Sequence, residues 1–234
     1  MITMKAVVIH AFGGSDRLQF QEVDTPTLGA NDVLVQVKAC ALNHLDIWVR
    51  KGLVALPMPH VLGSDVSGVI AEVGLEVHDV KVGDSVMVSP GLSCGHCEAC
   101  LKGRDNFCRE YAILGENVWG GYAEYVKVPR QNVLPMPDTL SFEEAAAMPL
   151  TFVTAWQMLV KRAQIKPGDW VLVLAAGSGI GVAAIQIAKL FGATVIATAS
   201  TSEKLLKAKS LGADYVINYR QKDFYEEVQN ITSR

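Results

Sequence analysis

The sequence predicts an α/β plus β fold, in which a β-rich, barrel-like part precedes a parallel α/β sheet. Up to about residue 140, short segments rich in β-branched and aromatic residues are separated by Gly, Pro and Asp. From Ser141 onward, apolar strands alternate with helical patterns. The chain has 234 residues, 50% of them hydrophobic, so it can bury one large core or two smaller ones. We therefore expect two domains, 1–150 and 151–234.

Composition also limits the function. High apolar content and a net charge of -3 exclude a mainly disordered chain and argue against a nucleic-acid partner. The most apolar run, Trp170–Ala188, is interrupted by Gly, Ser and Gln, so we expect no membrane span. Residues 1–13 lack the pattern of a secretory signal, which makes a cytoplasmic location the expectation.

Five strands are expected in the first domain, each bounded by turn residues such as Gly74, Gly83 and Pro129. They are Lys5–Ile9, Asp32–Ala39, Val66–Val73, Ser85–Ser89 and Tyr122–Val128.

In the second part, strands and helices are expected to alternate. Ser141 and Glu144 have the spacing of a capping box, which predicts a helix start, and a second helix is expected over Thr151–Arg162. The strands that follow are Val171–Ala175, Thr194–Thr198 and Tyr215–Asn218. The helices are Ile180–Phe191, Ser202–Leu211 and Lys222–Ile231.

A glycine-rich turn joins the first of these strands to its helix. Small residues let backbone amides approach a pyrophosphate, and the helix N-terminus adds a partial positive charge. The match to G-x-G-x-x-G is imperfect, because its first two glycine positions fall on Ala176 and Ser178, and glycines also serve simple packing. The strand-turn-helix context favours a dinucleotide site made of Gly177, Ser178, Gly179, Ile180 and Gly181.

The end of the second strand bears on the choice of cofactor. NAD sites usually place an acid there to bind the ribose 2′-hydroxyl, whereas this chain has Ser200, Thr201 and Lys204 nearby. Hydroxyls and a lysine suit a 2′-phosphate, so we favour NADP(H) over NAD(H). The alternative is that the hydroxyls only cap the next helix and that the lysine is solvated.

Four of the five cysteines form a C-x2-C-x2-C-x7-C cluster within about residues 91–110. Cys94, Cys97, Cys100 and Cys108 satisfy a closed tetrahedral site, which predicts one structural zinc per chain. An iron–sulfur cluster is less consistent with the long last gap and with Arg109 in place of a proline. Free thiols are the remaining alternative. His96 is surplus to four thiolates, and Cys40 is expected to be an ordinary buried residue.

Together these features resemble the medium-chain dehydrogenase/reductase family of zinc alcohol dehydrogenases and quinone oxidoreductases. The resemblance covers the chain from Met4 and also rests on Gly63–Val69, Gly120–Tyr125 and Lys209–Asp214. It implies a GroES-like barrel followed by a doubly wound Rossmann sheet, with the active site between them. It also implies a small-molecule carbonyl, quinone or alcohol as substrate, and a homo-oligomer for the full-length protein.

The chain departs from the family's pattern at the catalytic zinc. The first cysteine ligand corresponds to Asn43, the histidine with its neighbouring glutamate to Ser64-Asp65, and the last cysteine to Leu150. The hydroxyl that relays the alcohol proton corresponds to Leu45. We therefore predict that the chain has no catalytic zinc.

Another metal site is conceivable from acidic and histidine side chains in the same region. It would use His44, Asp46, His60 and Asp65, but nothing in their spacing shows that they converge. The two aspartates are more simply interpreted as hydrogen-bonding residues.

Without a Lewis acid, the expected reaction is hydride transfer to an acceptor that is already electrophilic, a quinone or an α,β-unsaturated carbonyl. The resemblance gives Asn43 a polar contact to the substrate or the nicotinamide ribose. It places His44 near the cofactor phosphate and Thr154 facing the nicotinamide.

Two alternatives stay open. One is an alcohol dehydrogenase with a remodelled metal site. The other is an inactive zinc- and nucleotide-binding fragment, because the chain supplies about three of the six strands of a Rossmann domain. We accordingly expect the sheet to be truncated.

Overall fold

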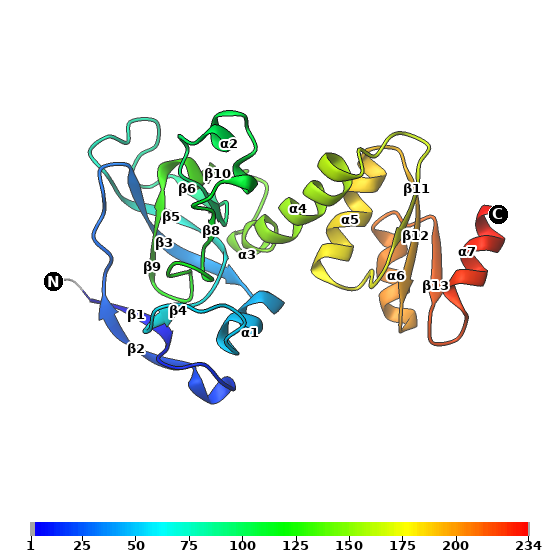
Figure 1. The fold of residues 1–234 in the computed structure, drawn as a ribbon, viewed down its shortest axis with the longest axis horizontal. Coiled ribbons are helices and arrows are strands. Elements are labelled where there is room, and N and C mark those ends of the chain that lie inside the picture. The colour runs from blue at the N-terminus through cyan, green and yellow to red at the C-terminus, as the bar shows by residue number, and fades with distance from the viewer. Residues whose placement is uncertain (1–2, 234) are drawn as a thin grey trace. The chain divides into compact units, whose positions relative to one another are not determined.

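The computed structural model describes residues 3–233, which form two compact units divided between Leu150 and Thr151 (Figure 1). The strands of the first unit are β1 Thr3–Ile9, β2 Gln19–Asp24, β3 Asp32–Ala41, β4 His60–Val61, β5 Asp65–Val73, β6 Ser85–Val88, β7 Gly91–Leu92, β8 Ala112–Ile113, β9 Tyr125–Pro129 and β10 Val133–Pro135. Its helices are α1 His44–Arg50, α2 Glu98–Leu101 and α3 Phe142–Ala146. The helix α4 Pro149–Trp156 spans the division.

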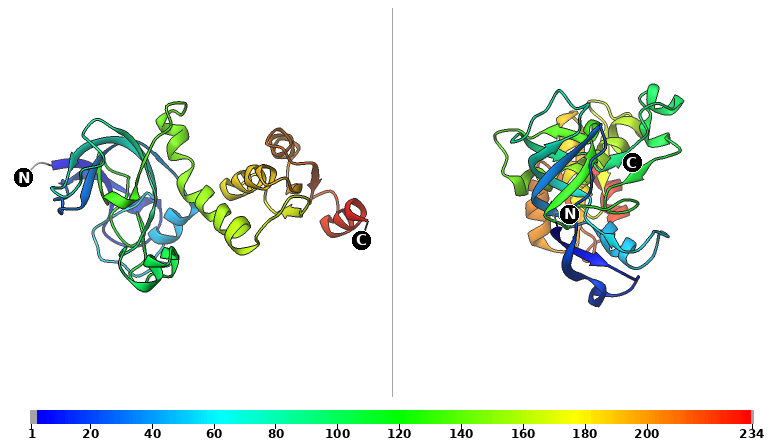
Figure 2. Two further views of the ribbon diagram at one scale, coloured as in Figure 1. Left: turned by 90° about the horizontal axis from the view of Figure 1, so that it is seen from above. Right: turned by 90° about the vertical axis from the view of Figure 1, so that its left-hand side faces the viewer.

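The first unit is built on a five-stranded antiparallel sheet in the order β10-β6-β5-β3-β9. A three-stranded sheet, β2-β1-β4, and the two-stranded sheet β7-β8 complete the unit. The strands of the unit curve around one another (Figure 2). The core consists mainly of valines, because alternate positions of a half-buried strand face inward and β-branched side chains pack well there. Val33 and Val35 of β3 are fully buried against Val66 and Ile70 of β5.

The pairing of β3 with β5 positions the candidate site. Ala41, the last residue of β3, pairs with Asp65, the first residue of β5. Asn43 follows two residues later, so it emerges beside Asp65. Gly63 has φ +100°, and a Cβ there would lie 2.6 Å from the Tyr122 ring. Only glycine fits this position without displacing the aromatic ring.

All five predicted strands of the first unit are present, and the largest shift of a boundary, three residues, is at the start of β9. The strand predicted to begin at Tyr122 begins at Tyr125, because residues 120–122 pair through single hydrogen bonds with the turn at residues 61–63. The prediction missed β2, whose side chains are largely exposed and give no strong alternation. It also missed α1, although Asn43 and Asp46 have capping-box spacing.

The second unit contains a three-stranded parallel sheet, β11-β12-β13. Its strands are β11 Trp170–Val173, β12 Thr194–Ala199 and β13 Tyr215–Asn218, and its helices are α5 Gly179–Leu190, α6 Ser202–Ser210 and α7 Phe224–Thr232. Helices α5 and α6 lie on one side of the sheet and α7 on the other (Figure 1). Alanines dominate the core between α5 and the sheet, which brings the helix close to the strands.

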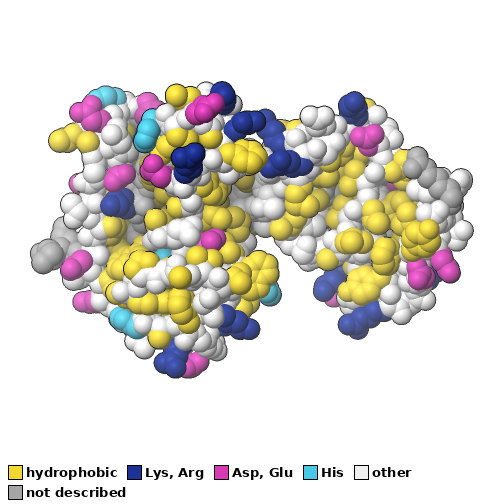
Figure 3. Space-filling model, viewed as in Figure 1, with side chains coloured by type: hydrophobic (Ala, Val, Ile, Leu, Met, Phe, Trp, Pro, Cys, Tyr) yellow, Lys and Arg dark blue, Asp and Glu magenta, His cyan; other side chains and the backbone are white. Residues whose placement is uncertain are grey.

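Two predicted elements of this unit differ most from the structure at their C-terminal ends, and the others end within one residue of the prediction. The helix predicted over residues 151–162 is α4 followed by a π-helical segment, Gln157–Arg162. The strand predicted to reach Ala175 ends at Val173, because Ala175 turns the chain with φ +52°. On the outer face of β11, the side chains of Trp170 and Leu172 remain exposed, and Figure 3 shows hydrophobic surface over this sheet.

Within residues 3–233, no helix combines the length and the apolar content that crossing a bilayer requires.

Candidate functional site

Asn43 and Asp65 form the centre of a hydrogen-bonded site in the first unit. Asn43 Nδ2 donates to Asp65 Oδ2 at 2.9 Å, and the backbone amide of Leu150 donates to Asp65 Oδ1 at 2.7 Å. Asp65 is only 1% exposed, so both carboxyl oxygens are satisfied out of contact with bulk water. The predicted hydrogen-bonding role of Asp65 is thus confirmed.

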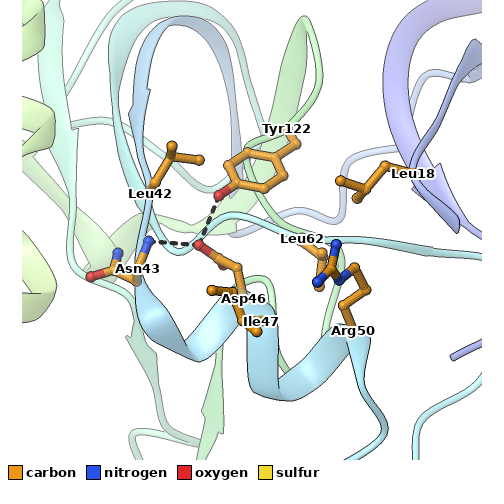
Figure 4. A pocket seen from close by; sticks show the side chains of 8 residues that line it. All are labelled: Leu18, Leu42, Asn43, Asp46, Ile47, Arg50, Leu62 and Tyr122. Carbon is orange, nitrogen blue, oxygen red and sulfur yellow. Dashed lines mark hydrogen bonds between the residues drawn. The ribbon is translucent and has the colours of Figure 1, made fainter. Parts of the chain in front are cut away.

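Asp46 extends this site along α1. Its Oδ2 accepts from the backbone amide of Asn43 and from the hydroxyl of Tyr122, both at 2.7 Å (Figure 4). The first of these bonds caps the helix, because the amides of its first turn have no partner within the helix. The second bond joins α1 to the Gly120–Tyr125 motif. Asp46 therefore holds two motifs together that are 76 residues apart in the chain.

Burial changes the acidity of groups in this site. Desolvation raises the pKa of Asp65 to about 6, although the hydrogen bonds from Asn43 and Leu150 favour its charged form. Burial and the neighbouring Asp46 also raise the pKa of Tyr122. Burial lowers the pKa of His60, whose Nε2 lies 3.2 Å from the carbonyl oxygen of Gly115. A tyrosine that stays protonated serves here as a permanent donor to Asp46.

These residues do not fit the metal position that the family places here. The amide of Asn43 is bonded to Asp65, and Leu150 offers no side-chain ligand. Ser64 is fully buried, and its hydroxyl has no partner within residues 3–233, but a lone hydroxyl does not make a zinc site. In the described part of the chain, the potential ligand atoms of His44, Asp46, His60 and Asp65 do not form a group within 4.8 Å.

The four clustered cysteines do converge. Their sulfur atoms all lie within 4.8 Å of one another. The Cys94–Cys100 distance is 3.9 Å, while the Cys97–Cys100 and Cys94–Cys108 distances are both 3.5 Å. Four thiolates at about 2.3 Å from one zinc ion would lie about 3.8 Å apart, so the geometry fits a tetrahedral ion.

The surroundings of these thiols also favour a metal. The backbone amides of Cys94 and Glu110 donate to the sulfur of Cys108, and that of Cys97 donates to Cys94, each at 3.4 Å. Hydrogen bonds from the backbone and thiol of Cys100 lower the pKa of Cys97 to about 7, whereas burial and the thiols of Cys94 and Cys100 raise the pKa of Cys108 to about 11. His96 lies close enough to Cys94 and Glu110 for a second group of possible ligands, although the four cysteines form a complete set without it.

The glycine-rich turn forms a hollow in the second unit. Its volume is about 300 Å³, and it is lined by Ala175, Gly177, Ser178, Ala199, Ser200, Lys204 and Tyr219. A Cβ on Gly181 would lie 2.6 Å from the carbonyl oxygen of Ala175, so the helix can start this close to the strand only with glycine there. The positive φ of Ala175 is a strained conformation of the kind found at ligand sites.

The residues predicted to select the cofactor divide into two groups. Ser200 and Lys204 line the hollow, and the stem of Lys204 lies so close to Gly177 that a Cβ there would be 2.9 Å from Lys204 Cδ. Thr201 is not among the residues that line the hollow, and its hydroxyl caps α6 by accepting from the Lys204 amide at 3.4 Å. Tyr219, which no sequence motif indicated, also lines the hollow.

The remaining predicted residues have these positions. Ser178 lines the hollow and caps α5 by accepting from the Gly181 amide at 3.0 Å. A Cβ on Gly179 would lie 2.8 Å from Cγ2 of Thr151, and Ile180 is exposed. Neither residue lines the hollow. His44 is exposed at the first turn of α1, with its ring edge-on to Trp48 at 4.8 Å. Thr154 lies on α4 in the second unit.

The sequence did not indicate that Asp46, Tyr122 and Arg50 surround one cavity together with Asn43. Only the Asn-x-x-Asp spacing at the start of α1 could have indicated part of this arrangement. Tyr122 comes from the distant 120–122 turn, so no local pattern brings it to this site.

Comparison with known families agrees with this architecture. Residues 29–138 match the alcohol dehydrogenase GroES-like domain, and residues 179–234 match the zinc-binding dehydrogenase family. An alcohol dehydrogenase of Geobacillus stearothermophilus is 42% identical over 224 residues, which cover 94% of this chain and 65% of that protein. The chain thus spans about two thirds of the length of that relative.

Solved structures are similar as well. The structure of an NAD-dependent alcohol dehydrogenase is 56% identical, has a TM-score of 0.96, and is matched over 98% of this chain and 68% of that one. A quinone oxidoreductase of Pseudomonas syringae pv. Tomato is 33% identical with a TM-score of 0.81, over 98% of this chain and 63% of that one. The chain therefore belongs to the zinc-type medium-chain dehydrogenase/reductase family.

Proposed function

We propose that this chain belongs to an NADPH-dependent oxidoreductase that reduces a quinone or an α,β-unsaturated carbonyl, with a structural zinc and without a catalytic one. The observation that carries the proposal is the bond between Asn43 Nδ2 and Asp65 Oδ2, in a place where the family holds a metal ion. An amide bonded to a buried carboxyl is a hydrogen-bonding group and a poor zinc ligand.

The residues of this site have a defined part in such a reaction. The bound nicotinamide would supply the hydride. Asn43 is half-buried, and its Nδ2 carries two hydrogens, of which one is given to Asp65. The second can be donated to the substrate oxygen on which negative charge develops, and a proton from water completes the reduction. Asp65 keeps the amide in the orientation that makes this donation possible.

The cofactor would be held by the hollow of the second unit. The turn from Gly177 to Gly181 leaves room for a pyrophosphate at the start of α5. Ser200 and Lys204 would bind the 2′-phosphate, and no acidic residue is among those that line the hollow. The four cysteines would hold the structural zinc, which stabilises their loop and takes no part in the hydride step.

The experiment measures zinc content and turnover on the same preparation. We expect one zinc per chain, bound by the cysteine loop, and NADPH oxidation with a simple quinone in a chain long enough to be active. Alcohol oxidation that depends on a second bound metal would contradict the proposal. Running the assay on the 234-residue chain and on a longer chain also tests whether this part alone turns over.

A second candidate is an alcohol dehydrogenase with a remodelled metal site, which the names of the relatives favour. Asn43→Ala separates the two. A donor to substrate oxygen predicts a loss of quinone turnover of about 10- to 100-fold with unchanged zinc content. A metal-dependent alcohol dehydrogenase predicts that metal stoichiometry and alcohol turnover fall together.

The cofactor assignment has its own test. Lys204→Ala should weaken NADPH binding by about tenfold and leave NADH binding nearly unchanged, because only NADPH carries the 2′-phosphate. Lys207→Ala, on the same helix but outside the hollow, is the matched control. Equal effects of Lys204→Ala on both cofactors would contradict the NADPH preference.

A further inference from the structure

Two consecutive side chains fasten the segment of chain that leads into the cysteine loop. Asn132 Nδ2 donates to the carbonyl oxygens of Ser89 at 2.9 Å and of Gly91 at 2.6 Å. Gln131 Nε2 donates to the carbonyl oxygen of Ser93 at 2.7 Å. The three acceptors belong to alternate residues, so they lie along one edge of an extended segment. The two side chains therefore hold this segment along its whole length.

The two side chains differ in their surroundings. Asn132 is 3% exposed, and both hydrogens of its Nδ2 are used in these bonds. Its backbone carbonyl also accepts from the Ser89 amide at 2.8 Å. Gln131 is exposed, and its Oε1 lies close to Gly95, where a Cβ would be 3.1 Å away from it. Gln131 can thus be altered without opening the core of the unit.

The short turn Arg130–Asn132, which carries both side chains, is itself fixed. The guanidinium of Arg130 donates to both carboxyl oxygens of Asp79 at 2.7 Å and to the carbonyl oxygen of Val133 at 2.8 Å. The Arg130 amide donates to the carbonyl oxygen of Asn31 at 2.9 Å. The turn is therefore a fixed support for the segment that it holds.

The four cysteines reach the metal position from two sides of the loop. Cys94 and Cys108 lie at its base, where β7 pairs with β8 and the Cys94 amide donates to the sulfur of Cys108 at 3.4 Å. Cys97 caps the four-residue helix α2, and Cys100 lies on it. The bond to Ser93 is next to Cys94, so the fastening acts on the two cysteines at the base.

We infer that Gln131 and Asn132 are positioning residues for the structural zinc. They hold Cys94 opposite Cys108 independently of the metal, so that the ion meets two ligands already in place. A loop that is ordered before binding loses less conformational entropy when it binds, which raises the affinity. The inference rests on the zinc assignment of the proposed function and adds two residues that set how tightly the metal is held.

The experiment measures the zinc affinity of the 234-residue chain by competition with a chelator that changes colour when it binds zinc. Gln131→Met keeps a neutral side chain of similar length and removes only the amide. We expect it to weaken zinc binding about three- to tenfold, which is the effect of one hydrogen bond.

The matched control is Gln186→Met in the second unit. Gln186 is also exposed, and its Nε2 also donates to a backbone carbonyl, that of Val182 at 3.2 Å. We expect this variant to bind zinc as tightly as the unchanged chain does, because its lost hydrogen bond is within α5 and away from the cysteine loop.

A second variant removes the other side chain of the pair. Asn132→Ala deletes two hydrogen bonds and should weaken zinc binding about 10- to 100-fold, the range found for residues that orient metal ligands. Because Asn132 is buried, its loss can also destabilise the first unit. Gln131→Met, at an exposed residue, gives the test that does not depend on this.

Unfolding midpoints distinguish positioning from a merely structural role. A merely structural contact lowers the midpoints of the zinc-loaded and the zinc-free chain alike, and zinc affinity then stays unchanged by linkage. A positioning residue lowers the midpoint of the zinc-loaded chain more than that of the zinc-free chain. We expect the second result for Gln131→Met and neither change for Gln186→Met.

Three outcomes would overturn the inference. The first is an unchanged zinc affinity in both Gln131→Met and Asn132→Ala. The second is a loss of affinity in Gln186→Met as large as that in Gln131→Met. The third is an unchanged chain that binds no zinc, which would refute the zinc assignment of the proposed function as well. Failure of quinone reduction alone leaves the inference standing.

Discussion

The cysteine loop and the Asn43–Asp65 site correspond to the two metal positions that the resemblance implies, and in this chain they differ in the use of their donor atoms. In the loop, four sulfur atoms converge and accept hydrogen bonds only from backbone amides and one another. In the Asn43–Asp65 site, both carboxyl oxygens of Asp65 accept hydrogen bonds, one from Asn43 Nδ2 and one from the Leu150 amide, while the buried Ser64 hydroxyl has no partner within residues 3–233.

A buried site needs its polar groups satisfied, and either an ion or a hydrogen-bond network can do this. Asp65 takes part in such a network here, because its carboxyl accepts hydrogen bonds from both Asn43 and the Leu150 amide.

The largest effect is expected in the cysteine loop. Cys97→Ser should reduce zinc from one per chain to almost none and lower the unfolding midpoint by about 15 °C or more, because a structural zinc contributes directly to folding. Atomic absorption and thermal unfolding measure both quantities. Cys40→Ala, which alters a thiol outside the loop, should keep its zinc. A Cys97→Ser protein with full zinc content would show that the cysteines are not the ligands.

A smaller effect is expected in the Asn43–Asp65 site. Asp65→Ala removes the acceptor that the Asn43 amide and the Leu150 N–H share, which should cost about 2 to 4 kcal/mol of unfolding free energy. Zinc content should stay at one per chain. Denaturant unfolding and metal analysis test this together. Asp79→Ala, which removes an exposed partner of Arg130, should cost much less. If Asp65→Ala instead lost a metal ion, the two regions would not differ as described.

The smallest effect is a pH dependence that distinguishes the two regions. The pKa of Asp65 is raised to about 6, so the folded state binds its proton more tightly than the unfolded state does. This contribution to stability is fully present below about pH 4 and is lost as pH rises through 6.

The measurement compares Asp65→Asn with the unchanged chain between pH 4 and 7. Relative to Asp65→Asn, the unchanged chain should lose up to about 3 kcal/mol over this range. The cysteine loop is the same in both proteins, so its own protonation cancels in the difference. A difference that grows in the opposite direction would mean that Asp65 is held ionised, as it would be beside a cation.

The elements that were predicted well have strong local patterns. The capping box at Ser141 starts α3, where Ser141 and Glu144 exchange hydrogen bonds, and β13 has the predicted bounds. The elements that were missed have weak local patterns. Strand β2 is exposed on most of its side chains, and α1 has only seven residues, so neither shows a clear periodicity.

The same distinction applies to the sites. The spacing of the four cysteines and the strand-turn-helix around Gly177–Gly181 were visible because neighbouring residues in the chain form them. Thr201 shows the limit of this reasoning. A hydroxyl beside a phosphate site and a hydroxyl at a helix start have the same sequence signal, and the structure uses this one as a cap.

By itself, the sequence determined the family, the order of a β-rich part and an α/β part, and the metal-binding loop, because each depends on short-range spacing. Only the tertiary structure decided which groups bond to Asp65 and what surrounds the cavity on α1. The bonds of Asp65 to Asn43 and Leu150 span 22 and 85 residues, and that of Tyr122 to Asp46 spans 76. Such contacts follow from the pairing of β3 with β5 and from the packing of the 120–122 turn, which no local pattern encodes.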